Sequence, residues 1–262
     1  MSVLNFNGSS HYLDGSGSGA LNAAMTVATL IRHDTLANTG CLMSTNSSVP
    51  AMGWEFKIES NDRPAIYNDN AGSTSDPGTG YEIDDTDEFW IVVFTYSPGE
   101  APRLHIQNST GAGAWLHADG DDTQVAPDSA AGGTVYIGAF NVPGSGLFDY
   151  FEGDIALHGL WNGIEMTDGQ VEDLGTGKHV DDWLEHAAGA PTSLTPMTSA
   201  TPTDLQGLIT WTNHGAALTG ADPAGWTLTP GGGGGGTDDI LVRVAGAWVA
   251  SDLKVRASGT WV

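Results

Sequence analysis

Short β-rich runs, separated by strong turn signals, fill most of residues 1–160 and limit the folds open to this chain. The run Val3–Asn7 ends at a glycine, and Met25–Arg32 is rich in β-branched and other apolar residues. Turn dipeptides such as Asp14-Gly15 and Pro98-Gly99 lie between the runs, and they favour chain reversals. The 37 glycines of the chain supply many further turn positions. Many short strands with such turns predict an all-β sandwich or barrel.

Two of the runs indicate how the strands contribute to a core. Trp54–Glu59 alternates apolar and polar residues, which places Trp54, Phe56 and Ile58 on one face of a strand. Phe89–Tyr96 is continuously apolar, and such a run is typical of a central strand in a sandwich.

The charge of the chain is strongly unbalanced. It carries 32 acidic residues against 8 lysines and arginines, a formal net charge of -24. Nucleic-acid binding requires basic residues that neutralise phosphates, so we expect no nucleic-acid partner. The charge favours solubility and repels anionic surfaces.

Cysteine content and hydropathy limit how the chain is stabilised and where it resides. Cys41 is the single cysteine, so stability must come from burial, and we expect Cys41 to be an inert, buried thiol. No apolar run approaches about 18 residues, and we therefore expect no membrane insertion. Residues 1–6 lack the basic and apolar regions of a secretory signal. We expect synthesis in the cytoplasm. If the protein ends up outside a cell, assembly into a particle released by lysis is one route.

The chain changes character after residue 160. Residues 167–174 and 180–188 combine capping residues with helical spacing and predict short helices. Residues 189–204 are rich in Pro, Thr, Ser and Ala and predict an extended connector, and two apolar patches between residues 208 and 228 predict late strands. Six consecutive glycines are the clearest linker. The expected organisation is a β-sandwich ending in short helices (1–188), a connector with late strands (189–230), a glycine linker (231–236) and a β-repeat anchor (237–262).

An internal repeat follows the glycine linker. Residues 242–249 (Val-Arg-Val-Ala-Gly-Ala-Trp-Val) are echoed 13 residues later by residues 255–262 (Val-Arg-Ala-Ser-Gly-Thr-Trp-Val). Each unit predicts a strand, a glycine turn and a second strand. Two such units are too small to bury much apolar surface alone, so we expect them to dock on a partner chain or on copies of themselves; the alternative is docking on their own sandwich. The expected anchor residues are Val242, Arg243, Trp248, Val249, Val255, Arg256, Trp261 and Val262.

An ordered set of segments resembles a known family. The segments are residues 3–8, 25–27, 89–96, 135–138, 151–156 and 166–171. Their order and composition resemble those of the laminin G-like, concanavalin A-like jelly-roll family, in which an N-terminal Leu-x-Phe-Asp-Gly precedes an apolar strand, a Phe-x-Gly-x-Ile strand and Leu-Thr-Asp-x-Glu. The resemblance covers about residues 3–175. It implies an all-β, concanavalin A-like (laminin G-like) jelly-roll β-sandwich, to which the repeat adds a small C-terminal β appendage.

The family fold hosts lectins, adhesion modules, glycosidases and inert spacers, so it does not define the function. The C-terminal repeats, however, resemble the ends of minor tail and other virion proteins of phages. Our main hypothesis is a non-enzymatic structural protein on the virion surface of a tailed phage, either a capsid decoration or a minor tail protein, anchored by its repeat. Its expected partners are other virion proteins, further copies of the chain in a homo-oligomer, and a cell-surface glycan. The alternatives are a carbohydrate-binding lectin module without a virion role, and a glycoside hydrolase.

Glycosidases of this fold carry two glutamates flanking an aspartate on one strand, and Glu82–Glu88 is the segment that approaches this pattern. On a strand, Glu82 and Glu88 would lie about 20 Å apart, whereas the reaction needs carboxyl groups about 5–9.5 Å apart. The sequence also lacks a nucleophile elbow and a phosphate-binding loop. We therefore expect no enzyme, and a polar loop at this segment.

Calcium is the metal that the sequence favours, because clustered carboxylates are its preferred ligands and laminin G-like folds often hold calcium at the sandwich rim. The candidate ligands are Asp84, Asp85, Asp87, Asp119, Asp121 and Asp122. The eight histidines are scattered. We expect the one close pairing, His117 with Asp119, to be a chance neighbour and not a metal site.

Sugar-binding sites combine exposed aromatic rings, which stack on the sugar, with polar groups that bind its hydroxyls. Trp90 and Trp161 lie in expected core strands, so we expect them to pack there. Trp115 is the first candidate for sugar stacking and Tyr67 the second. The complete set of candidate sugar-binding residues is Trp115, His117, Asp119, Asp121 and Tyr67.

Overall fold

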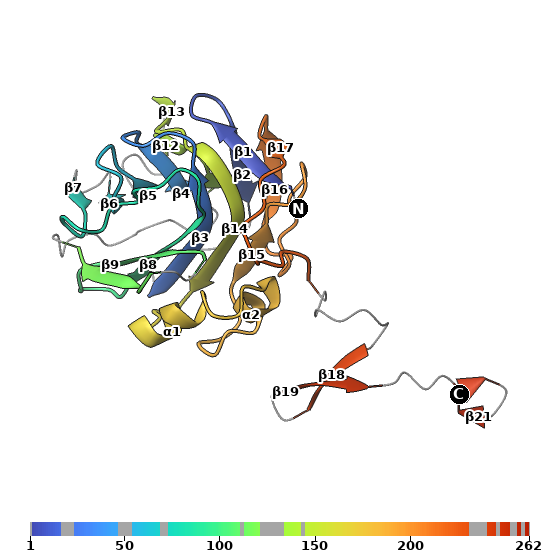
Figure 1. The fold of residues 1–262 in the computed structure, drawn as a ribbon. Coiled ribbons are helices and arrows are strands. Elements are labelled where there is room, and N and C mark those ends of the chain that lie inside the picture. The colour runs from blue at the N-terminus through green and yellow to red at the C-terminus, as the bar shows by residue number, and fades with distance from the viewer. Residues whose placement is uncertain are drawn as a thin grey trace. The chain divides into compact units, whose positions relative to one another are not determined.

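The computed structural model describes residues 2–16, 24–46, 54–68, 73–110, 113–120, 134–142, 145–230, 240–244, 247–251, 256–257 and 260–261. The chain divides into two compact units, Met1–Pro230 and Gly231–Val262. The first unit is built almost entirely of antiparallel strands, with two short helices on one side (Figure 1). The predicted all-β sandwich is therefore confirmed.

Sheet A has the strand order β10-β9-β8-β3-β14-β1-β17. β14 lies at its centre, between β3 on one side and β1 on the other, and β15 pairs with β14 beyond the end of β1. The strands are β1 (Val3–Asn7), β3 (Met25–His33), β8 (Trp90–Tyr96), β9 (Arg103–Asn108), β10 (Leu116–Asp119), β14 (Glu152–Asn162), β15 (Ser193–Pro196) and β17 (Ala217–Thr219).

Sheet B has the order β16-β2-β11-β4-β5-β6-β7. A separate hairpin of β12 and β13 follows β11 in the chain. The strands are β2 (Tyr12–Ser16), β4 (Gly40–Asn46), β5 (Trp54–Ile58), β6 (Pro64–Asn68), β7 (Ser73–Ser75), β11 (Thr134–Ile137), β12 (Phe140–Val142), β13 (Gly146–Phe148) and β16 (Thr210–His214).

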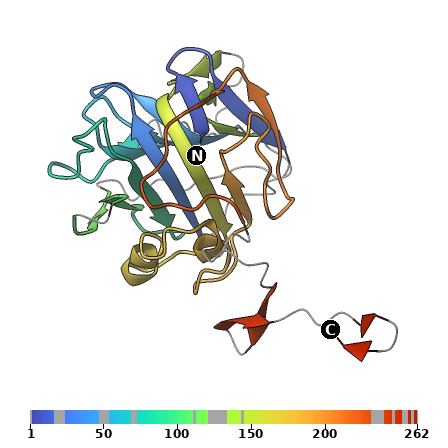
Figure 2. The same ribbon diagram turned by 45° about the vertical axis from the view of Figure 1, so that its right-hand side comes forward.

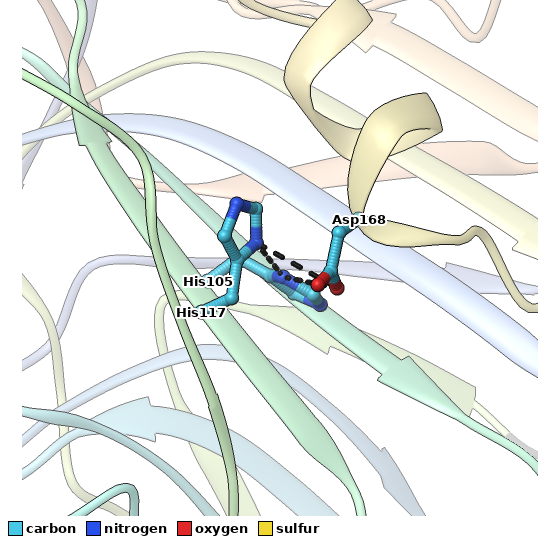
Figure 3. A group of neighbouring side chains, drawn as sticks. All are labelled: His105, His117 and Asp168. Atoms are coloured by element: carbon cyan, nitrogen blue, oxygen red, sulfur yellow. Dashed lines mark hydrogen bonds and ion pairs between the residues drawn. The ribbon is translucent and has the colours of Figure 1, made fainter.

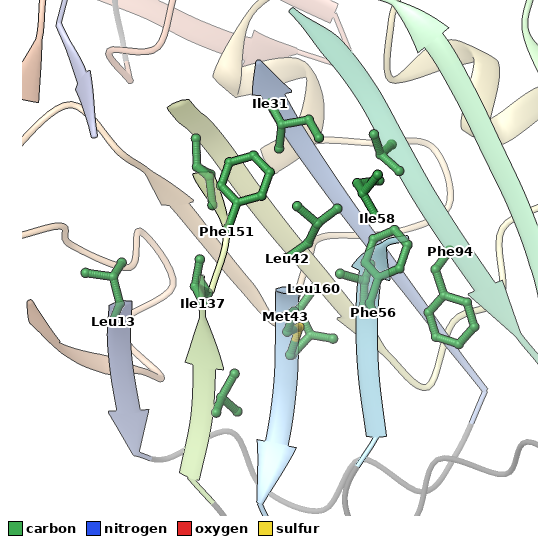
Figure 4. Packing of buried hydrophobic residues seen from close by; sticks show 14 of the residues in the cluster. Leu13, Ile31, Leu42, Met43, Phe56, Ile58, Phe94, Ile137, Phe151 and Leu160 are labelled. Atoms are coloured by element: carbon green, nitrogen blue, oxygen red, sulfur yellow. The ribbon is translucent and has the colours of Figure 1, made fainter. Parts of the chain in front are cut away.

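The main core lies between the two sheets (Figure 4). Trp54, Phe56 and Ile58 point into it from β5, as their alternation predicts. We call this group the inner cluster; its members include Leu13, Ile31, Leu42, Met43, Trp54, Phe56, Ile58, Phe94, Ile137 and Leu160.

A second core covers the outer face of sheet A. Ile91 and Val93 of β8 belong to it, whereas Val92 and Phe94 of the same strand belong to the inner cluster. The continuous apolar run of β8 therefore reflects a strand that is buried on both faces. We call the second core the outer cluster; its members include Ala28, Leu30, Ile91, Val93, Leu157, Trp161, Val171, Leu174, Trp183, Trp226 and Leu228.

The helices α1 (Asp168–Asp173) and α2 (Val180–Leu184) supply part of that cover. Both fall where the sequence predicts helices. The backbone N–H of Thr167 donates to the Gln170 side chain over 2.9 Å at the start of α1, which satisfies one of the free donors of a helix end. Trp183 of α2 is fully buried, and its indole N–H donates to the backbone oxygen of Leu174 over 2.8 Å. The helices are thus fixed against sheet A by packing as well as by capping.

Residues 189–230 are packed into the first unit. Part of the expected extended connector forms β15, because the second half of β14 has an open edge beyond β1 to which residues 193–196 hydrogen-bond. The late apolar patch at 208–211 leads into β16, which pairs with β2. The patch at 226–228 forms no strand: after β17 the chain crosses the outer face of sheet A (Figure 2), and Trp226 and Leu228 are buried there in the outer cluster.

The second unit contains two hairpins, β18 (Ile240–Val244) with β19 (Ala247–Ser251) and β20 (Arg256–Ala257) with β21 (Thr260–Trp261). The sequence repeat appears in their register. Arg243 lies opposite Trp248 in the first hairpin, and Arg256 lies opposite Trp261 in the second. Val255 and Val262, the remaining expected anchor residues outside these strands, lie outside the described residues.

One smaller expectation also has a counterpart in the structure. Cys41 is buried on β4, and burial raises the pKa of its thiol well above the usual value, which makes it unreactive. In the described part of the chain, no helix is both long and apolar enough to span a membrane.

Candidate functional sites

A row of polar and aromatic residues crosses the outer face of sheet B. Directly opposite residues of antiparallel strands share a face. The register therefore aligns, from β16 to β6, Thr212, Asp14, Tyr136, Ser44, Glu55 and Tyr67. These side chains point away from the inner cluster, on the outer face of sheet B.

The hairpin β12–β13 stands beside this row and forms the wall of an open hollow of about 430 Å³. Phe148, at the end of β13, is 45% exposed. The Phe140 ring meets the Tyr67 ring edge-on, with centroids 6.0 Å apart. The hollow is lined by Glu55, Lys57, Tyr67, Phe140, Phe148 and Asp149, among others.

Glu55 brings a carboxyl group to the floor of this hollow. Its side chain is fully buried, next to the Cys41 thiol and the Lys57 ammonium. The nearest charge is the Lys57 ammonium, 3.4 Å from one oxygen. Burial raises the pKa of Glu55 to about 8, against the opposing effect of Lys57. At neutral pH the group is therefore mostly a neutral acid that can donate a hydrogen bond.

Lys57 connects the acids and the aromatic ring of the hollow. Its ammonium lies 3.1 Å from a Glu59 oxygen and 3.8 Å from an Asp149 oxygen. The same nitrogen lies 5.1 Å from the centre of the Tyr67 ring, within cation–π range. Burial favours the neutral amine, but the surrounding carboxylates outweigh it and raise the pKa of Lys57. The hollow thus places a fixed cation beside aromatic surface, with the buried Glu55 carboxyl group next to that cation.

A second cluster of polar groups lies on the outer face of sheet A, at the edge formed by β9 and β10 (Figure 3). His105 and His117 are directly opposite each other, and their Nδ1 atoms are 2.7 Å apart. Asp168, the first residue of α1, places its Oδ1 atom 3.9 Å from the Nδ1 of His105 and 3.8 Å from that of His117. Burial, together with His117 and Arg103, lowers the pKa of His105 to about 3.

Arg103 holds the carboxylates around this cluster. Its Nε and Nη2 atoms each donate to one oxygen of Asp168 over 2.7 Å, and its Nη1 donates to Asp119 over 2.5 Å. The hydrogen bonds from Arg103 lower the pKa of Asp168. Asp168 is consequently an anion with a fixed orientation.

The structure divides the predicted sugar-binding residues between the two faces. Tyr67 lines the hollow on sheet B. Trp115, His117 and Asp119 lie on or beside β10 in sheet A. There Trp115 packs against the outer cluster and stacks on His117, with ring centroids 6.0 Å apart. Asp121 lies outside the described residues.

Several residues of the hollow were not among the sequence candidates. Glu55 and Lys57 alternate with core residues on β5, so the pattern predicts only that they point away from the core. Phe148 and Asp149 come from a hairpin whose position over sheet B has no local sequence signal. The hollow therefore depends on tertiary structure.

The acidic segment before β8 is a loop, as predicted. Glu82 accepts a hydrogen bond from Arg63 over 2.9 Å, and Glu88 accepts one from Asn108. The backbone N–H of Asp87 donates to Asp85 over 2.6 Å. Asp122, like Asp121, lies outside the described residues.

Comparisons with known proteins place the fold. No family model matches the sequence, and no curated protein matches it. Among solved structures, a heptameric SAP-like pentraxin from Limulus polyphemus superposes with a TM-score of 0.55 at 15% identity, covering 81% of this chain and 94% of that one. A "putative carbohydrate binding protein" from Bacteroides ovatus has a TM-score of 0.55 at 16% identity, covering 83% of this chain and 59% of the other.

These similarities, together with the sheet order, define the first unit as a jelly-roll sandwich of the laminin G and pentraxin type. At such identities they show the fold alone, so any function must be argued from the sites.

Proposed function

We propose that this chain is a carbohydrate-binding jelly-roll module whose sugar sits in the hollow on the outer face of sheet B. The observation that carries the proposal is the exposed Phe148 ring at an open hollow, whose lining also combines the Tyr67 ring with the polar side chains of Lys57 and Asp149. Glu55 is fully buried beside the Lys57 ammonium, so it supports Lys57 and does not itself contact the sugar.

The remaining groups suit the same ligand. The C–H face of a sugar ring stacks on aromatic surface, here Phe148 and Tyr67, while its hydroxyls need convergent donors and acceptors. Lys57 supplies donors and Asp149 an acceptor within the same hollow. We infer binding without cleavage, because Glu82 and Glu88 are held in separate polar contacts on a loop.

The experiment begins with the full chain on a glycan array. Titration calorimetry of the strongest glycan then compares wild type with Phe148→Ala and with Leu218→Ala. Leu218 is a matched control because it is an equally exposed side chain, 45% accessible, but lies on β17 of sheet A. Loss of an aromatic contact worth about 1–1.5 kcal/mol predicts roughly tenfold weaker binding for Phe148→Ala, and no change for Leu218→Ala.

Three outcomes would contradict the proposal. Absence of binding to every glycan removes the function. Binding that is weakened by Trp115→Ala and not by Phe148→Ala moves the site to β10. Release of sugar products from the bound glycan refutes binding without cleavage.

We propose in addition that residues 231–262 anchor the module in a larger assembly, such as the surface of a tailed phage particle. The support is the separate compact unit that these residues form and the equivalent Arg–Trp register of its two hairpins. Repetition of one pairing suggests repeated contacts with partner virion proteins or with copies of the same chain. Head decoration and a minor tail role both fit this arrangement.

Deletion of residues 231–262 tests the anchor. The truncated chain should retain glycan binding but be absent from purified particles, while the intact chain is incorporated. Normal incorporation of the truncated chain would rule out the anchor and leave the lectin function standing.

A further inference from the structure

We propose that His105, His117 and Asp168 form a binding site for one divalent transition-metal ion, with zinc as the best match. The site lies on the outer face of sheet A, between β9, β10 and α1 (Figure 3). The hollow lies on the outer face of sheet B. The two proposals therefore rest on different residues, and either can fail without the other.

The three ligand atoms have the spacing that a metal ion requires. The Nδ1 atoms of His105 and His117 and the Oδ1 atom of Asp168 form a triangle with sides of 2.7, 3.8 and 3.9 Å. The point equidistant from these atoms lies about 2.1 Å from each, which matches the usual distance from zinc to imidazole nitrogen and carboxylate oxygen.

Both imidazoles are already oriented through their other nitrogen. The Nε2 of His105 lies 3.2 Å from the Thr95 hydroxyl, and the Nε2 of His117 lies 3.2 Å from a Glu172 carboxylate oxygen. Metal-binding histidines typically donate their second ring N–H to an oxygen in this way, which fixes the tautomer and directs the free nitrogen at the ion. Arg103 gives Asp168 the same kind of support.

The charge around the site fits a divalent cation. With both imidazoles neutral, the carboxylates of Asp119, Asp168 and Glu172 and the guanidinium of Arg103 sum to a charge of -2. Each oxygen of Asp168 accepts one hydrogen bond from Arg103 and retains a further lone pair for a metal. The cation of Arg103 is therefore offset and does not exclude the ion.

The ligand set selects the class of metal. Two nitrogen ligands and one carboxylate favour zinc and its neighbours, whereas calcium and magnesium prefer oxygen ligands alone. His105 is fully buried, but the side chain of Asp168 is 41% exposed. That side leaves a route for the ion and a position for water as a fourth ligand. A bound ion would tie α1 to the sheet edge at β9 and β10.

The test uses the full chain, stripped of metal with a chelator and titrated with zinc chloride by calorimetry. We expect one ion per chain, an increase in Tm on zinc addition, and binding weakened at least tenfold in His117→Gln and in Asp168→Asn. Glu172→Gln, which removes only the support of His117, should weaken binding by about tenfold or more. His214→Gln is the matched control, because His214 also contacts an acid, Asp14, but lies on β16 of sheet B, away from the proposed site.

Stoichiometric zinc binding that these three variants weaken and the control does not supports the site. No binding by the wild-type chain overturns it, as does binding that His117→Gln leaves unchanged. Calcium binding at the same residues overturns the choice of metal. Should a variant fail to fold, titration of the wild-type chain in competition with a chelator of known affinity still decides whether a zinc site exists.

Discussion

Replacing Glu55 by glutamine gives the sharpest test of the chemistry of the hollow. The substitution keeps the size and shape of the side chain and removes its ability to ionise. Lys57 keeps its contacts with Glu59 and Asp149, so the change leaves no isolated buried cation. The difference between the two proteins should therefore report the titration of one carboxyl group.

The magnitude follows from the pKa of Glu55, about 8 in the folded chain against an ordinary value of 4.5. Because the folded-state value is the higher one, the contribution of Glu55 to stability is fully present below pH 4.5 and is lost as the pH rises through 8. By proton linkage, the raised pKa lowers the free energy of unfolding of the wild type, relative to its value at low pH, by about 1 kcal/mol at pH 5, about 3 kcal/mol at pH 7 and about 5 kcal/mol at pH 9. Glu55→Gln should thus gain about 4 kcal/mol relative to wild type between pH 5 and pH 9.

Urea unfolding at pH 5, 7 and 9, monitored by tryptophan fluorescence, measures this gain. Glu59→Gln is the control: its carboxylate contacts the same Lys57 ammonium but is partly exposed, so the same substitution should leave the pH dependence close to that of wild type. A difference between Glu55→Gln and wild type that stays constant from pH 5 to pH 9 would refute the assignment of Glu55 as a neutral buried acid.

Three further predictions concern the stability of the sandwich, each measured by urea unfolding. Asp204 is buried and accepts hydrogen bonds from four backbone N–H groups. Asp204→Ala should therefore lower the free energy of unfolding by about 3 kcal/mol or more, and Asp204→Asn should lower it less. An unchanged unfolding midpoint in Asp204→Ala would contradict this. Gly153 has a φ of +144°, and an added Cβ would lie 2.1 Å from the backbone oxygen of Arg32. Gly153→Ala should therefore lower the free energy of unfolding by more than about 3 kcal/mol. Gly169→Ala is the control and should be tolerated, because there is open space around Gly169. Burial lowers the pKa of His158 to about 3, so the stability of the folded chain should fall as the pH drops below 6.5, the ordinary pKa of histidine. Between pH 7 and pH 5, wild type should lose about 2 kcal/mol more stability than His158→Gln. Equal losses in the two proteins would refute the assignment of His158 as a buried neutral imidazole.

The sheets could be predicted from the sequence wherever a strand has a clear pattern of burial. β5 alternates because one face meets the inner cluster, and β8 is continuously apolar because it meets both clusters. β15 had no such signal. Apart from Leu194, its residues are small, polar or proline, and it forms because β14 extends beyond β1 and leaves unpaired backbone groups to which β15 hydrogen-bonds.

The sites were less predictable than the strands for a physical reason. His105, His117 and Asp168 are separated by 12 and 51 residues, and only the register of β9 with β10 and the packing of α1 bring them together. The sequence instead singled out His117 with Asp119, which are near in the chain. In the structure Asp119 pairs with Arg103, and it is Arg103 that positions Asp168 beside the histidines.

The unequal cover of the two sheets explains why the two proposed sites differ in kind. The outer face of sheet A is covered by α1, α2 and the crossing segment after β17, and the cluster of His105, His117 and Asp168 lies at the edge of this cover. A small ion is the ligand that such a confined cluster can admit. On the outer face of sheet B, the hairpin β12–β13 stands beside the row of polar and aromatic side chains, and two members of this row, Glu55 and Tyr67, line an open hollow. A ligand with many hydroxyls and an apolar face fits there. If glycan binding is found, it should therefore respond to Phe148 and be indifferent to removal of zinc.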